Sequence, residues 1–217
     1  MRKRSRFLLL AAAVVLAAAG CPSKTTPKKR PAGGPWEGRL TVVTGDWTQL
    51  KALIDSHSSQ VVVVDVWGTW NESGRREIPN LAKLQKKYGD KVACIVACCD
   101  FGFEEGESLE DVRAKAEKLL RKQFGKVLGK DEVLKPTVTL FIANQTTEDF
   151  YESAEIEAAP TVLIYGKTGK RIVIDDESVQ PPPTKTAKTG TASTAPTRVT
   201  ISYQKHVLPI VEKLIKE

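Results

Sequence analysis

The stretch Val61–Pro79, which reads VVVVDVWGTWNESGRREIP, decides the fold. Its first part is a near-continuous apolar run, which is typical of a strand buried on both faces of a parallel sheet. Asn71 is a good N-cap residue, and apolar residues recur after it at helical spacing as far as Tyr88. The stretch therefore predicts a buried strand over 61–67 that leads directly into a helix over 71–88.

The rest of the chain alternates between strand and helix patterns. Short apolar runs predict strands, and apolar stripes at a spacing of three and four residues predict amphipathic helices. The expected further strands are 40–44, 92–99, 138–142, 161–165 and 171–174, and the expected further helices are 46–55, 109–124, 148–153 and 207–216. This order predicts an α/β fold in which helices flank a central mixed sheet.

The decisive stretch resembles the active-site segment of thioredoxin-family proteins, in which a strand leads into W–x–x–W–C–x–x–C–R–x–E–x–P. Asp65 stands where the family keeps a buried acid, Ala159-Pro160-Thr161 matches its cis-proline loop, and Glu77-Ile78-Pro79 matches the helix continuation. The long stretch before the cis-proline loop is similar to the TlpA-like and redoxin-type branches. The resemblance implies a thioredoxin-like fold with an extra helix and strand inserted before that loop.

The two cysteines of the family motif are absent. They would fall at Asn71 and Gly74, directly after Trp70. Neither residue can form a thiolate, which is the species that attacks a disulfide. The resemblance thus implies the frame of a disulfide oxidoreductase with a degenerate redox site at Asp65, Trp70, Asn71 and Gly74. Either a water channel and hydroxyls such as that of Thr69 satisfy Asp65, or its pKa is raised and it is a relic.

Cys98 and Cys99 are the candidates for surviving thiol chemistry. They end the predicted strand 92–99, which should lie beside 61–67, and parallel strands end at the same edge of a sheet. Adjacent strand residues point to opposite faces, so a disulfide between these two would distort the backbone. Cys94 shares a face with Cys98 but lies roughly 13 Å away at ~3.3 Å per residue. Two interpretations remain: small buried core side chains, or a redox centre at Cys98 or Cys99.

The N-terminal residues predict export and lipid attachment. Residues 2–6 carry four basic side chains, residues 7–19 are apolar, and small residues precede Cys21. This pattern is typical of a signal peptide over 1–20, and its ending resembles a bacterial lipobox, which implies a lipid on Cys21. An ordinary signal peptide with a chance cysteine is the alternative. The expected domains are a disordered tether over 21–35 and one domain over 36–217, with a disordered low-complexity insert at 180–197.

Charge and composition exclude several function classes. The 217-residue chain has a net charge of +7, but the four basic residues of 1–20 belong to the predicted signal peptide, which leaves 29 basic and 26 acidic side chains. A domain so near to neutral lacks the basic stripe that nucleic-acid binding requires. The acidic loop 100–107 lacks the ligand spacing of an EF-hand and is expected to be solvated. His57 and His206 are far apart in sequence, so we expect neither a metal nor a cofactor.

These observations favour a redox-inactive lipoprotein of the bacterial cell envelope, on the periplasmic face or in the outer membrane. The family resemblance implies a groove for an extended peptide or an envelope protein partner. The groove would be lined by Trp67, Trp70, Ala159, Pro160 and Thr161. Two alternatives remain open: a thiol-disulfide oxidoreductase or antioxidant protein that acts through Cys98 or Cys99, and a purely structural envelope component.

Overall fold

The computed structural model describes residues 36–102, 104–129, 134–135, 137–179 and 200–217. These residues belong to one structural unit, Pro31–Glu217. The predicted signal peptide, the tether with Cys21 and the insert at 180–197 lie outside the described residues.

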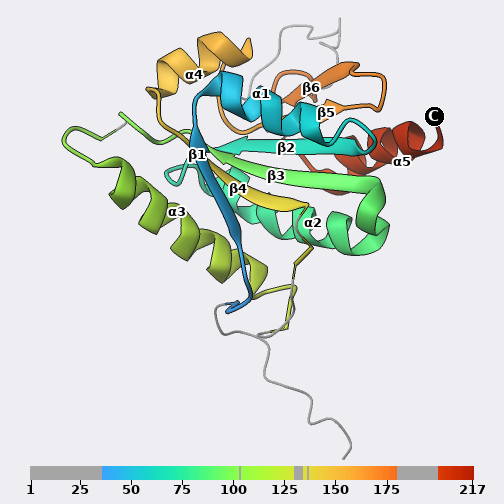
Figure 1. Ribbon diagram of the computed structural model, residues 1–217, viewed down its shortest axis with the longest axis horizontal. Coiled ribbons are helices and arrows are strands. Elements are labelled where there is room, and N and C mark those ends of the chain that lie inside the picture. The colour runs from blue at the N-terminus through green and yellow to red at the C-terminus, as the bar shows by residue number, and fades with distance from the viewer. Residues whose placement is uncertain (1–35, 103, 130–133, 136, 180–199) are drawn as a thin grey trace, which may run out of the picture. The chain divides into compact units, whose positions relative to one another are not determined.

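A six-stranded mixed sheet forms the centre of this unit (Figure 1). Its strands are β1 (Thr41–Gly45), β2 (Val61–Trp67), β3 (Val92–Cys98), β4 (Val138–Ala143), β5 (Thr161–Tyr165) and β6 (Arg171–Asp175), in the order β1-β4-β3-β2-β5-β6. β1, β4, β3 and β2 are parallel, whereas β5 is antiparallel to β2 and β6 to β5. Every residue of β2 and β3 is buried, as the apolar runs predict.

Helices cover both faces of the sheet. The helices are α1 (Trp47–Ser56), α2 (Glu72–Tyr88), α3 (Leu109–Phe124), α4 (Thr147–Ala154) and α5 (Leu208–Lys216). α1 and α4 pack on one face, and α2, α3 and α5 pack on the other (Figure 1). The mixed α/β fold with flanking helices is confirmed, and the ends of its elements lie within one residue of the predicted ends.

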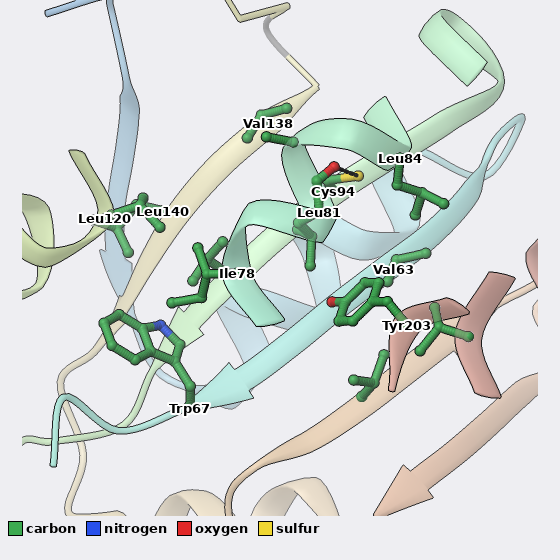
Figure 2. Close-up of a cluster of buried hydrophobic side chains, with 14 of the residues drawn as sticks. Val63, Trp67, Ile78, Leu81, Leu84, Cys94, Leu120, Val138, Leu140 and Tyr203 are labelled. Carbon is green, nitrogen blue, oxygen red and sulfur yellow. Dashed lines mark hydrogen bonds between the residues drawn. The ribbon is translucent and has the colours of Figure 1, made fainter. Parts of the chain in front are cut away.

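Two apolar clusters lie on opposite sides of the sheet. The larger packs α2 against the central strands, and Figure 2 draws Ile78 and Leu81 of this helix together with Val63 and Trp67 of β2. The second cluster lies beneath α1 and α4 and includes Phe141 and Phe150, both fully buried. Because side chains alternate along β3, Cys94 and Cys98 lie in the first cluster and Cys99 in the second.

Two short elements have no counterpart in the sequence prediction. One is the 3-10 turn Gly89–Lys91, which follows α2. Tyr203–Val207 forms a π-helical turn directly before α5, whose Pro209 stands in the first turn as expected. The turn carries Tyr203 into the larger cluster, where Figure 2 shows its ring beside Val63. In the part of the chain that the structure describes, no helix is both long and apolar enough to span a membrane.

Candidate functional site

The start of α2 is held by the residue that stands in place of the first motif cysteine. The Asn71 side-chain oxygen accepts a hydrogen bond from the Gly74 backbone N–H at 2.9 Å and from the Ser73 hydroxyl at 2.7 Å. Asn71 thereby satisfies one of the four backbone N–H groups that a helix start leaves without a partner. The two positions of the missing cysteine pair therefore contact each other through a capping hydrogen bond.

The same asparagine joins the helix start to the cis-proline loop. Its side-chain Nδ2 donates to the Ala159 carbonyl at 2.9 Å, and the Ala159–Pro160 peptide bond is cis. A Cβ placed on Gly74 would lie 3.4 Å from the Cβ of Pro160 and 3.5 Å from that of Trp67. Position 160, which is far from positions 71 and 74 in sequence, is thus brought against them as the resemblance implies.

Asp65 lies buried beneath this helix start, and its partner comes from the C-terminal turn. The Tyr203 hydroxyl donates to the Asp65 carboxyl at 2.8 Å. Burial raises the pKa of Asp65 to about 7, the hydrogen bond from Tyr203 opposes the rise, and the Glu77 carboxylate adds to it. A cavity of about 10 Å³, close to the space that one water molecule needs, lies between Asp65, Gly74 and Tyr203.

The hydroxyl of Thr69, which the sequence offered as a partner for Asp65, instead binds Asp100. The Thr69 backbone N–H donates to the two Asp100 carboxyl oxygens at 2.8 and 3.1 Å, and the Thr69 hydroxyl also donates to this carboxyl. Asp100 is buried at the carboxyl end of β3, so the expectation that the whole loop 100–107 is solvated is wrong for this residue. Because β2 and β3 are parallel neighbours, the end of β3 meets the loop that follows β2.

The three described cysteines are free, buried thiols. Cys94 lies 3.7 Å from the Leu81 carbonyl oxygen (Figure 2), and Cys99 lies 3.3 Å from the Trp67 carbonyl oxygen. Burial raises the pKa of the Cys98 thiol well above its usual range and that of Cys99 to about 12. At neutral pH these side chains are protonated and shielded, which disfavours nucleophilic chemistry.

The groove residues that the resemblance implies divide into an exposed and a buried group. Trp70 is 38% exposed, and Ala159 and Pro160 line a surface hollow. Trp67 and Thr161 are buried, because each is a strand residue whose side chain points into the core, so they support the groove from below rather than form its wall. Gly68 leaves room for the Trp70 side chain, because a Cβ at position 68 would lie 2.3 Å from the Trp70 indole nitrogen.

The hollow beside the cis-proline has a volume of about 290 Å³ and an acidic wall. Its floor comes from Asn71, Ser73 and the loop 158–160, and its wall carries four carboxylates. These are Glu157, Asp175, Asp176 and Glu177. No sequence pattern indicates this wall, because its residues lie on both sides of the β5–β6 hairpin and come together only in the folded chain.

Comparisons with known proteins give partial matches. No protein-family model matches the sequence. The chain is 34% identical over 68 residues to the thioredoxin-like protein YneN of Bacillus subtilis, a match that covers 31% of this chain and 38% of that protein, less than two thirds of its length. Similar solved structures include the thioredoxin-like superfamily protein SPOA0173, at 14% identity and a TM-score of 0.43 over 76% of this chain and 85% of that one. Another is the thioredoxin domain of a thiol-disulfide oxidoreductase from Bacteroides vulgatus, at 20% identity and a TM-score of 0.36. This match covers 55% of this chain and 71% of that one.

The strand order and the contact between the start of α2 and the loop before β5 decide the fold. The domain has a thioredoxin-like fold. In this thioredoxin-like domain, Asn71 and Gly74 face the cis-proline loop and Asp65 lies beneath them. Between α2 and the loop, the chain carries β3, α3, β4 and α4, which accounts for the long stretch seen in the sequence.

Proposed function

We propose that this chain is a redox-inactive member of the TlpA-like branch that binds an extended peptide segment of a partner protein. The observation that carries the proposal is the hollow of about 290 Å³ at the cis-proline, which is lined by amide, hydroxyl and carboxylate groups and by no thiol. A site of this composition can hold a ligand by hydrogen bonds and charge but cannot exchange disulfides.

The acidic wall defines the class of peptide. Glu157 and Glu177 are exposed at the rim, and Asp175 and Asp176 complete the wall. A lysine or arginine side chain of an extended segment would place its charge among these carboxylates while its backbone lies along the loop 158–160. The Trp70 indole, which precedes Asn71 in the chain and is 38% exposed, offers an additional apolar surface.

The proposal includes the envelope location. The basic and apolar N-terminal residues and the small residues before Cys21 support export followed by lipid attachment to that cysteine. Metabolic labelling with palmitate in a bacterial host tests this part. We expect the label to enter the full chain and to be absent from the Cys21→Ser variant, whereas equal labelling of the two would contradict lipid attachment at Cys21.

Calorimetric titration with matched peptides tests the binding site. We expect an extended peptide with a central lysine or arginine to bind, and its glutamate counterpart not to bind. Glu157→Gln combined with Glu177→Gln should weaken binding several-fold, because exposed charge pairs contribute about 0.2–1 kcal/mol each. The control is Glu148→Gln combined with Glu152→Gln, on α4 outside the hollow. Binding that is equal for both peptides, or that falls equally in both double variants, would contradict an acidic peptide site.

A further inference from the structure

The C-terminal turn forms contacts with three separate parts of the domain. The Tyr203 hydroxyl binds Asp65 of β2 at 2.8 Å, and the Tyr203 backbone N–H binds the Glu77 carboxylate of α2 at 3.2 Å. The backbone N–H of Ile201 binds Asp176 after β6 at 3.2 Å. The segment Thr200–Val207 is therefore held at its inner side by two acidic groups near the helix start and at its outer side by the wall of the hollow.

This segment also separates Asp65 from the surface. Thr200, Ile201 and Tyr203 line the cavity of about 10 Å³ above Asp65, and Ser73 and Pro160 line both this cavity and the larger hollow. Displacement of the segment would join the two spaces and bring water to the Asp65 carboxyl. The segment thus covers Asp65 where the linings of the two spaces meet.

We infer that Thr200–Val207 is a pH-dependent latch, seated over Asp65 when this carboxyl is protonated and released when it ionises. The inference concerns the resting protein and does not depend on the proposed peptide ligand. Its physical basis is that a closed, nearly dry site penalises a charged carboxylate, whereas an open site lets water solvate it.

The titratable groups around Asp65 also disfavour its ionised form. The titratable groups that face it are Glu77 from α2, Cys94 from β3 and Tyr203 from the latch itself, and none of them is cationic. An ionised Asp65 therefore adds a second negative charge beside Glu77, to which the latch is also bound through its backbone. Nothing in this set compensates the charge except the single hydroxyl of Tyr203.

The latch also contains an internal hydrogen bond. The Nδ1 atom of His206 accepts the Ser202 backbone N–H at 3.0 Å. Release through Asp65 occurs as the pH rises, so a loss of protection as the pH falls would have another cause.

Hydrogen exchange of the full chain, followed by mass spectrometry and corrected for intrinsic rates, tests the latch. The reporter is the segment 201–206, whose amides of Ile201, Ser202, Tyr203 and His206 are hydrogen-bonded. With the pKa of Asp65 raised to about 7, we expect protection of this segment to fall about tenfold between about pH 6 and about pH 8. The strand β3 serves as the internal reference for global unfolding.

Two variants separate the latch from other causes. Asp65→Asn cannot ionise and should give a protection that is independent of pH, and Tyr88→Phe, which removes a phenol bound to Glu212 on α5, should keep the wild-type profile. A wild-type profile that is flat or that falls toward low pH overturns the inference, and this result requires no variant. It is equally overturned if the segment exchanges only together with β3, or if Asp65→Asn keeps the wild-type pH dependence.

Discussion

The buried carboxyl of Asp65 should make the stability of the domain depend on pH in a way that one substitution removes. Its pKa rises from 3.8 to about 7 on folding, chiefly through burial. A carboxyl whose pKa is higher in the folded state stabilises that state fully below its unfolded pKa, and this contribution is lost as the pH rises to the folded pKa. At about 1.4 kcal/mol per pH unit, the difference corresponds to about 4 kcal/mol.

Asp65→Asn keeps the size of the side chain and the acceptor for Tyr203 but cannot ionise. Urea unfolding followed by tryptophan fluorescence, in steps from about pH 4 to about pH 8, should show that the free energy of unfolding of the wild type falls by about 4 kcal/mol relative to the variant. Asp55→Asn, at an exposed carboxylate on α1, is the control and should follow the wild type apart from a small offset. Parallel curves for wild type and Asp65→Asn would refute the reasoning, since they would mean that Asp65 has the same pKa in the folded and unfolded chains.

Three further predictions concern the residues around the helix start. Asn71→Ala removes the helix cap and the bridge to Ala159, and should lower the free energy of unfolding by about 1–2 kcal/mol in urea unfolding; an unchanged value would contradict the capping role. Asp100→Ala leaves the Thr69 N–H and hydroxyl without their partner and should cost about 2–3 kcal/mol, whereas a loss below about 0.5 kcal/mol would show that water replaces the carboxylate. Asn71→Cys combined with Gly74→Cys should form a disulfide under mild oxidant, scored by mass spectrometry, and the single variants should not; a double variant that stays reduced would contradict the contact between positions 71 and 74.

The sequence predicts those parts of the fold that depend on local signals. Neighbouring residues alone indicate the apolar run of β2, the cap at Asn71 and the apolar stripe of α3. The predicted bounds of these elements therefore agree with the structure. The contact between the helix start and Pro160 follows from the family resemblance rather than from any local pattern. The structure agrees with it, because Asn71 and Gly74 lie against the Ala159–Pro160 loop in the folded chain.

The parts that the sequence does not predict depend on contacts between distant residues. Tyr203 and Asp65 are 138 positions apart, and the π-helical turn that joins them has no periodic signature. Asp100 belongs to a run of acidic residues that looks solvated, and its burial follows only from the position of β3 beside β2. Trp67 was expected to line the groove, but the register of β2 turns its side chain into the core.

A thiol titration tests the proposal that the domain is redox-inactive. The measurement uses the Cys21→Ser form of the full chain, so that Cys94, Cys98 and Cys99 remain, and compares native and denaturing buffer with and without prior reduction. We expect that no thiol reacts in the native state and that all three react on unfolding without reductant. A thiol that reacts rapidly at neutral pH in the native state, or that reacts only after reduction, would contradict this proposal and identify a redox centre at Cys98 or Cys99.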